Sequence, residues 1–235
     1  MHMIGCLIIH GYTGGPHEID PLVQYLKKHT DWSIKVPVLP GHGDKLQLDD
    51  VCYKDWLYAA EESFLHLKKN NEKLYLIGFS MGGMIAAYLA AKYEIEKLVL
   101  LAPAGKYLSI KHLGQYVGDV ISDSVKGKLN ENEKYLRYKN KIGEVPLKAN
   151  IEFVRLVKFT RQFLKDIKAP VLIVHGQQDG LVPAKTGYYL DKEIGSTEKE
   201  IVFLERSDHL LCLGEDKEIL NHMVFDFLNK EKAVT

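Results

Sequence analysis

The fold of this chain is decided by the stretch Lys73-Leu74-Tyr75-Leu76-Ile77-Gly78-Phe79-Ser80-Met81-Gly82-Gly83-Met84-Ile85-Ala86-Ala87-Tyr88-Leu89-Ala90-Ala91. Residues 73–77 form a short, mostly apolar run, which predicts a buried β-strand. Residues 84–91 are rich in helix formers. Ser80 is therefore expected at a sharp turn from a strand into a helix.

In this context the G-x-S-x-G pattern of residues 78–82 predicts a nucleophile elbow, a strained turn that exposes the hydroxyl of Ser80. Gly78 and Gly82 carry no Cβ atom, so we expect the strand and the helix to approach closely there. The free N–H groups at the helix start favour negative charge nearby. The alternative is a glycine-rich turn that contains a serine by chance, and the strand before it and the helix after it favour the elbow.

Length and composition predict one α/β domain with an insertion. The chain has 235 residues, of which 46% are hydrophobic and 26% charged, as in an ordinary globular protein. Lysine and arginine number 31, as do aspartate and glutamate, so the net charge is zero. This balance argues against a nucleic-acid partner, which would favour a basic surface.

The cysteines and the N-terminus bear on cofactors and location. Cys6, Cys52 and Cys212 are widely scattered, which predicts neither a disulfide framework nor a metal site. Reduced thiols are typical of a cytoplasmic protein, which is the location we expect. The N-terminus shows no signal-peptide pattern. No apolar run reaches the roughly 18 residues of a membrane span, so we expect no stable membrane insertion.

Strands and helices are expected to alternate along most of the chain. The apolar patterns predict strands at 3–9, 33–39, 73–77, 97–101, 172–175 and 199–204, and helices at 17–28, 53–69, 84–91, 185–190 and 216–229. Such alternation indicates an α/β fold with a mostly parallel sheet and helices on both faces.

One long stretch interrupts this alternation. Residues 104–148 contain no clear buried strand, and a long insertion on the loop side of a sheet is usually functional. We predict a small helical cap over Ser80 in which Leu113 and Val117 line the substrate pocket. The core would then comprise residues 1–103 and 149–235. The alternative is a surface helical hairpin with no role in substrate binding.

A serine hydroxyl is a weak nucleophile until a base takes its proton, and that base is usually a histidine held by a carboxylate. Among ten histidines, His209 follows the last strand, at the sheet edge expected for Ser80. His10, His42 and His175 are rivals. His10 and His175 each end a strand before a glycine, so we expect them to have a structural role or to orient loops.

Two aspartates compete as the carboxylate. Asp179 follows the penultimate strand at the same sheet edge as Ser80. Asp208 is adjacent to His209 in sequence, but adjacent side chains usually point apart in an extended stretch. We therefore predict Asp179, and the order Ser, Asp, His agrees with the elbow motif.

Negative charge on a substrate oxygen requires preorganised N–H donors. The backbone of Met81, directly after Ser80, is one expected donor, and Tyr12, in the loop after the first strand, is the other. Gly11, Gly14 and Gly15 let this loop approach the substrate. A phosphate-binding loop is the rival interpretation, but neither G-x-x-x-x-G-K-[ST] nor G-x-G-x-x-G occurs there.

These motifs recur in order across nearly the whole chain, and together they resemble the α/β-hydrolases, most closely the small bacterial carboxylesterases and monoacylglycerol lipases. The residues that carry the resemblance are His10-Gly11-Tyr12-Thr13-Gly14-Gly15-Pro16, Pro40-Gly41-His42-Gly43, Asp55-Trp56, Gly78-Phe79-Ser80-Met81-Gly82-Gly83, His175-Gly176, Asp179, Val182-Pro183, Ser207 and His209. The resemblance implies hydrolysis of carboxylic esters, no cofactor and a modest cap.

The chain departs from the family pattern in two places. Its first strand begins almost at residue 1, so the usual opening antiparallel strands are expected to be short or absent, leaving about six strands. Asp208 stands where the family commonly has glycine before the catalytic histidine. Either the loop is less tight, or the added charge favours protonated His209.

The leading hypothesis is a serine hydrolase acting on short or medium acyl esters or monoacylglycerols, with a small-molecule ester as its partner. A feruloyl or cinnamoyl ester and a lysophospholipid are alternatives within this class. The same triad also serves cofactor-free haloperoxidases, carbon–carbon bond hydrolases and non-hydrolytic ligand receptors. The sequence does not indicate the oligomeric state.

Overall fold

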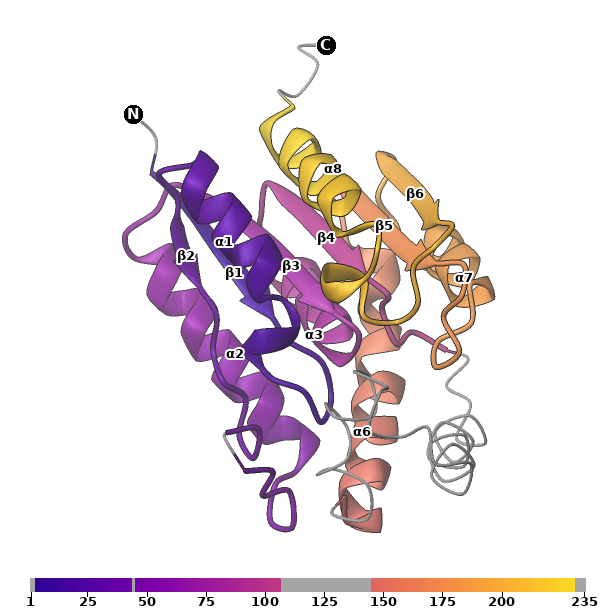
Figure 1. Cartoon of the computed structure of the whole chain (residues 1–235). Coiled ribbons are helices and arrows are strands. Elements are labelled where there is room, and N and C mark those ends of the chain that lie inside the picture. The colour runs from indigo at the N-terminus through magenta and orange to yellow at the C-terminus, as the bar shows by residue number, and fades with distance from the viewer. Residues whose placement is uncertain (1–2, 44, 107–144, 231–235) are drawn as a thin grey trace.

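The computed structural model describes residues 3–43, 45–106 and 145–230 (Figure 1). Six strands form one sheet in the order β2-β1-β3-β4-β5-β6, and every neighbouring pair is parallel. Their bounds are β1 (Ile4–Ile9), β2 (Ser33–Lys35), β3 (Lys73–Phe79), β4 (Lys97–Leu101), β5 (Val171–Gly176) and β6 (Lys199–Leu204). The predicted α/β class and the predicted number of strands are confirmed.

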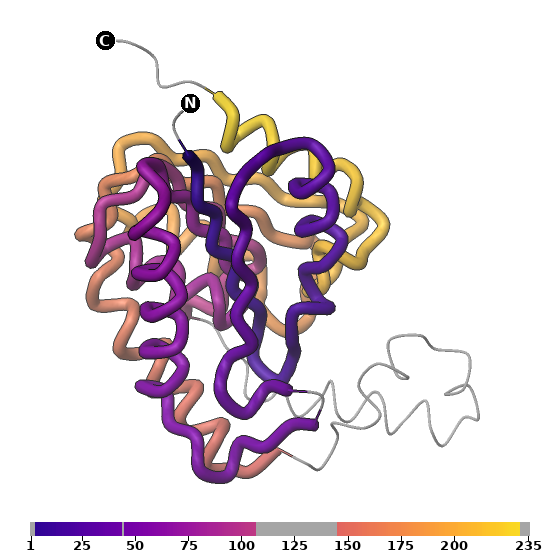
Figure 2. The backbone as a smooth tube through the Cα atoms, turned by 90° about the vertical axis from the view of Figure 1, so that its left-hand side faces the viewer, coloured from indigo at the N-terminus to yellow at the C-terminus, as the bar shows by residue number. Residues whose placement is uncertain are grey.

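The helices lie on both faces of the sheet. The α-helices are α1 (Asp20–His29), α2 (Tyr53–Lys68), α3 (Met81–Lys92), α6 (Leu147–Thr160), α7 (Lys185–Glu193) and α8 (Lys217–Asn229). The 3₁₀ segments are η1 (Pro16–Glu18), η3 (Arg161–Asp166) and η4 (Leu211–Leu213). Seen from the β2 edge, α2 lies on one side of the strands and α1 and α8 lie on the other (Figure 2).

Alternation along the strands divides the core into two clusters. Leu7 and Ile9 of β1 pack with the α2 and α3 side, whereas Cys6 and Ile8 pack with α1 and α8. Successive strand residues point to opposite faces of a sheet, so one apolar run fills both layers. This accounts for the near-continuous apolar sequence of β3 and β5.

The strand predicted at 33–39 is shorter than expected, because β2 ends at Lys35. Pro37 explains the difference. Proline has no N–H to donate to a neighbouring strand and restricts the residue before it. The edge strand therefore ends, and the chain continues to the loop that contains Pro40 and His42.

The insertion lies largely outside the described residues. Leu113 and Val117 belong to residues 107–144, so the cap and its pocket stay a prediction. The described chain resumes at Val145, and α6 begins at Leu147, so the boundary expected at residue 148 falls in the first turn of a helix. Along the described ranges, we find no helix with both the length and the apolar character that crossing a membrane requires.

Candidate active site

Ser80 lies between the end of β3 and the start of α3, as predicted. Its backbone has φ 52° and ψ −114°, in a region that residues other than glycine rarely adopt. Backbone hydrogen bonds hold this conformation: the Ser80 N–H donates to Leu101 O at 2.8 Å, and Ser80 O accepts from the N–H groups of Gly83 and Ala104, both at 3.1 Å. The turn is thus fixed from β4 as well as from its own helix.

The two glycines of the elbow are required by close backbone contacts. A Cβ atom on Gly78 would lie 2.3 Å from the carbonyl oxygen of Gly82. A Cβ atom on Gly82 would lie 2.2 Å from the carbonyl oxygen of Ile9. Both contacts are with backbone atoms, which cannot move aside as a flexible side chain can. The predicted close approach of strand and helix is confirmed.

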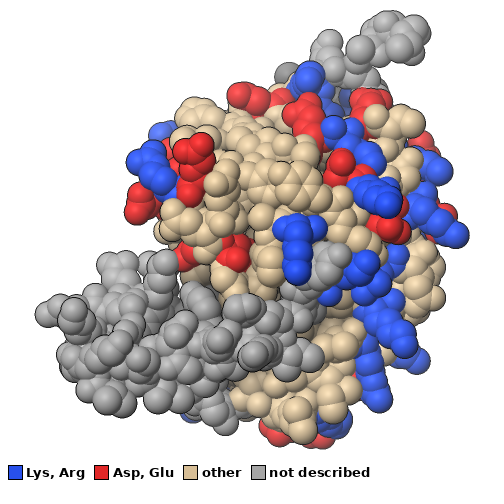
Figure 3. All heavy atoms as spheres, turned by 90° about the vertical axis from the view of Figure 1, so that its right-hand side faces the viewer, with Lys and Arg blue, Asp and Glu red and all other residues tan. Residues whose placement is uncertain are grey.

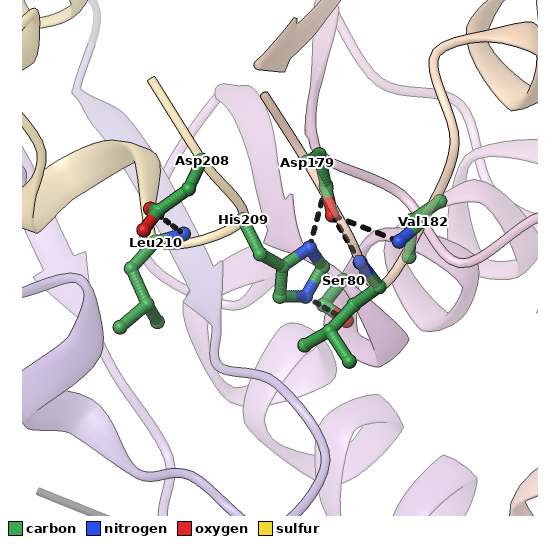
Figure 4. Close-up of polar contacts among 7 residues, drawn as sticks. Ser80, Asp179, Val182, Asp208, His209 and Leu210 are labelled. Carbon is green, nitrogen blue, oxygen red and sulfur yellow. Dashed lines mark hydrogen bonds and ion pairs between the residues drawn. The ribbon is translucent and has the colours of Figure 1, made fainter. Parts of the chain in front are cut away.

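The structure brings Ser80, His209 and Asp179 together at the carboxyl edge of the sheet (Figure 4). His209 Nε2 lies 3.0 Å from Ser80 Oγ, and His209 Nδ1 lies 2.7 Å from Asp179 Oδ2. All three residues are less than 9% exposed. In the neutral tautomer that fits these contacts, Nδ1–H donates to Asp179 and Nε2 accepts from the serine hydroxyl.

The second oxygen of Asp179 is also engaged. Oδ1 accepts hydrogen bonds from the backbone N–H groups of Leu181 and Val182, each at 2.8 Å (Figure 4). Burial alone would raise the pKa of this carboxyl, but the charge and hydrogen bond of His209 and the two N–H donors hold it below its usual value. Asp179 is therefore ionised near neutral pH.

The pKa of His209 is raised in turn. Burial opposes protonation of the ring, and this effect is outweighed by the charge and hydrogen bond of Asp179 and then by the charges of Glu18 and Asp208. The ring is thus prepared to accept a proton. Sequence reasoning did not find Glu18, because nothing in the sequence indicates that a helix-forming glutamate turns toward a histidine 191 positions later.

Asp208 points away from the imidazole. Its Oδ1 accepts the backbone N–H of Leu210 at 3.0 Å (Figure 4), and its effect on the pKa of His209 comes after those of Asp179 and Glu18. The structure therefore places Asp179, and not Asp208, in contact with His209, as the strand-end argument predicted.

The rival histidines His10 and His42 hold loops. His10 Nδ1–H donates to Gly11 O at 2.9 Å, while its Nε2 accepts the N–H of Leu39 at 3.1 Å. His42 Nδ1–H donates to Pro40 O at 3.0 Å. The bond between His10 and Leu39 joins the loop after β1 to the segment after β2, which agrees with the loop-orienting role expected for His10.

The loop after β1, residues 11–15, is held in place through the side chain of Tyr12, and we call it the oxyanion loop because Tyr12 is the predicted oxyanion donor. Its ring stacks on Phe153 with centroids 4.6 Å apart, and its hydroxyl donates to Asn150 Oδ1 at 3.1 Å. Within the described ranges, the backbone N–H groups of Tyr12 and Met81 have no hydrogen-bond acceptor. Two such donors beside an elbow serine can receive a substrate oxygen.

His175 is buried with no exposed surface, and burial lowers its pKa from 6.5 to about 4. The folded state then binds fewer protons than the unfolded state between these pH values, so stability falls as the pH drops from 6.5 toward 4, by about 3 kcal/mol. We expect the free energy of unfolding of His175→Gln to fall less steeply over this pH range than that of the wild-type protein. The measurement is the free energy of unfolding in urea at several pH values, and parallel curves for the two proteins would contradict it.

Comparison with known proteins decides the family. A family model described as "Serine aminopeptidase, S33" (Hydrolase_4) matches residues 5–217. The chain belongs to this family. Within the described ranges, this S33 family member contains no cluster of three or more His, Cys, Asp or Glu side chains that could hold a metal ion.

Relatives of this S33 family member include two bacterial enzymes that align over almost their whole length. One is a thermostable monoacylglycerol lipase of Bacillus sp. (strain H-257), which is 29% identical over 97% of this chain and 91% of its own. The other is a carboxylesterase of Bacillus subtilis (strain 168), which is 21% identical over 95% and 92%.

Solved structures share the fold. One of the metagenome-derived lipolytic enzymes LipS and LipT superimposes with a TM-score of 0.79 at 21% identity, covering 98% of this chain and 95% of that one. The monoacylglycerol lipase of Paleococcus ferrophilus gives 0.72 at 17% identity, with 95% and 93% covered. Together with the family model and the aligned relatives, this shared fold confirms the resemblance to the α/β-hydrolases.

Proposed function

We propose that the protein is a serine hydrolase that cleaves carboxylic esters through an acyl-enzyme intermediate. The observation that carries this proposal is the position of His209, which bridges Ser80 at 3.0 Å and Asp179 at 2.7 Å. The S33 family and the monoacylglycerol lipase and carboxylesterase among the relatives support ester hydrolysis.

In the first half of the reaction, Ser80 Oγ attacks the ester carbonyl carbon while His209 Nε2 takes the hydroxyl proton. The carbonyl oxygen becomes an oxyanion, which the N–H groups of Met81 and Tyr12 would stabilise. Asp179 holds the imidazolium that forms. His209 then gives the proton to the departing alkoxide, so the alcohol leaves and the acyl group stays on Ser80.

In the second half, a water molecule takes the place of the alcohol. His209 removes its proton, the hydroxide attacks the acyl carbon, and the oxyanion forms in the same place. When this intermediate collapses, the proton returns to Ser80 Oγ and the carboxylic acid is released. The cycle needs no cofactor, because each proton is held by His209 in turn.

We propose a monoacylglycerol or an ester with a short or medium acyl chain as the substrate. The test is a kcat/KM profile over nitrophenyl esters from acetate to palmitate, a monoacylglycerol, a feruloyl ester and a lysophospholipid. Preference for a feruloyl ester or a lysophospholipid would change the substrate while keeping the reaction. An amino-acyl anilide and a diketone are also assayed. If the protein hydrolyses the anilide or the diketone but none of the esters, the ester proposal is overturned.

For the cell, we propose a cytoplasmic protein that acts on a small molecule and binds no nucleic acid. All three cysteines are free, as is typical of a reducing compartment. In Figure 3 basic and acidic side chains lie close together over the upper part of the face, whereas mostly basic side chains lie along its lower right edge. A nucleic-acid partner would favour a basic protein, and the equal numbers of basic and acidic residues, 31 each, argue against one.

Leu113 and Val117 test the proposed cap through acyl-chain length. Each methylene covered by an apolar wall contributes about 0.8 kcal/mol, so a lost wall should matter more for longer chains. We expect Leu113→Ala and Val117→Ala to lower kcat/KM progressively from acetate to longer esters. A ratio of variant to wild-type activity that does not depend on chain length would refute the pocket while leaving the triad unaffected.

A further inference from the structure

A buried carboxylate lies directly against the oxyanion loop. Glu18 ends η1, immediately after that loop, and is only 5% exposed. A Cβ atom on Gly14 would lie 1.6 Å from Glu18 Oε2, 2.0 Å from Cδ and 2.2 Å from Oε1. A Cβ atom on Gly11 would lie 3.3 Å from Oε2. The carboxylate thus occupies the space that side chains of this loop would otherwise fill.

The glycine at position 14 follows from this contact and not from backbone strain. Gly41 is the one glycine with positive φ among the residues that the structure describes. The φ of Gly14 therefore lies outside the left-handed region that favours glycine, but a methyl group there would overlap the carboxyl group of Glu18. Gly14 and Glu18 form a matched pair, in which the absence of one side chain makes room for the other.

The same carboxylate lies near the ring that packs on His209: a Cβ atom on Gly11 would lie 3.1 Å from the Phe79 ring and 3.3 Å from Glu18 Oε2, and the Phe79 and His209 ring centroids are 5.0 Å apart. The charge of Glu18 raises the pKa of His209, after the effects of burial and Asp179, and it adds to the rise that burial causes at Cys212 in η4. Glu18 therefore lies between the loop proposed to bind the oxyanion and the loop that carries the proposed base. Within the described ranges, the other titratable groups that interact with His209 are Asp179, Asp208 and His175.

We propose that Glu18 is a positioning residue of this site, whose buried carboxylate fixes the oxyanion loop through Gly14 and supplies a further negative charge beside His209. The proposal rests on the proposed function. Transfer of the Ser80 proton makes His209 a cation, and a nearby anion stabilises that cation. A buried anion with a fixed position acts more strongly than one in water.

The charge is tested by Glu18→Gln, which keeps the shape of the side chain. His209 must be unprotonated to act, so kcat/KM falls as the pH drops through its pKa. We expect the acidic limb of the pH profile to move to lower pH in Glu18→Gln, and to move less in Asp208→Asn. A Glu18→Gln profile that coincides with the wild-type profile would overturn the electrostatic role, because a merely structural effect lowers activity at every pH.

The packing is tested by Gly14→Ala, alone and combined with Glu18→Ala. Displacing the loop by about 1 Å can cost roughly 10²-fold in kcat/KM, and we expect a loss of that order for Gly14→Ala. Removing the carboxylate opens space for the methyl group, so Gly14→Ala/Glu18→Ala should be more active than Gly14→Ala alone. Losses that simply multiply in the double variant would overturn the pairing.

Gly15→Ala is the matched control in the same loop. Its backbone is extended, with φ −174°, and a Cβ atom there would meet the His17 ring at 3.1 Å. We expect Gly15→Ala to lose less kcat/KM than Gly14→Ala. Adding Glu18→Ala to Gly15→Ala should not restore any kcat/KM. If Glu18→Ala raised kcat/KM of Gly15→Ala as much as it raised that of Gly14→Ala, the recovery would be unspecific and the pairing would be overturned.

Failure of this proposal is distinguishable from failure of the proposed function. The rate at which a fluorophosphonate labels Ser80 reports its activation by His209, whatever the natural substrate is. The pH dependence of this labelling rate should shift to lower pH in Glu18→Gln, in the same direction as the acidic limb of kcat/KM. If the wild-type protein cleaves no ester, the labelling rate and the thermal unfolding of the Gly14 and Glu18 variants still decide whether Glu18 holds the loop.

Discussion

Replacing Ser80 with alanine should lower kcat for ester hydrolysis by roughly 10⁴- to 10⁶-fold, which leaves only the contributions of substrate binding and the oxyanion donors. The expected loss is large because Ser80 Oγ is the atom that His209 contacts at 3.0 Å, and no acyl-enzyme forms without it. The alanine variant is also expected to fold. The backbone hydrogen bonds of residue 80 do not involve the side chain.

The matched control for this change is Ser63→Ala, since Ser63 is equally buried but lies in α2, away from the site. A fluorophosphonate should add one adduct to the wild-type protein and to Ser63→Ala, and none to Ser80→Ala, as measured by mass spectrometry. Activity of Ser80→Ala within tenfold of wild type, or an adduct on another residue, would refute Ser80 as the nucleophile.

Much of the fold and of the candidate site could be predicted because the signals are local. The apolar run before Ser80 and the helix formers after it specify a strand and a helix without reference to the rest of the chain. In a parallel sheet the carboxyl ends of strands share one edge. Asp179 and His209 could therefore be placed beside Ser80 from their positions after two strands, and the structure brings these three residues together.

The contacts that could not be predicted join residues far apart in the sequence. Tyr12 packs on Phe153 and donates to Asn150, but no pattern in α6 indicates which helix face meets the oxyanion loop. Nothing in the sequence distinguishes Glu18 from other residues near the start of a helix. Its burial follows only from the three-dimensional path of the chain. Sequence periodicity predicts which elements form, whereas such side-chain pairs depend on how elements pack.

Asp179→Asn should lower kcat by around 10⁴-fold, because it changes which nitrogen of His209 carries the proton. Asp179 Oδ1 accepts two backbone N–H groups at 2.8 Å, so the amide oxygen of the variant is held at that position. The amide NH₂ then faces Nδ1 at the place of Oδ2 and donates to it. The proton of His209 moves to Nε2, which can no longer accept the proton of Ser80.

Asp208→Asn is the matched comparison, because it makes the same chemical change one residue before His209. Its Oδ1 accepts the N–H of Leu210, whereas the Nδ1 of His209 is bonded to Asp179, so the tautomer of His209 is unaffected. We expect a far smaller loss of kcat and an acidic limb of kcat/KM displaced to lower pH, since removing a nearby anion lowers the pKa of His209. Steady-state kinetics over the pH range separates the two roles. If Asp208→Asn costs more than Asp179→Asn, then Asp208, and not Asp179, orients the base.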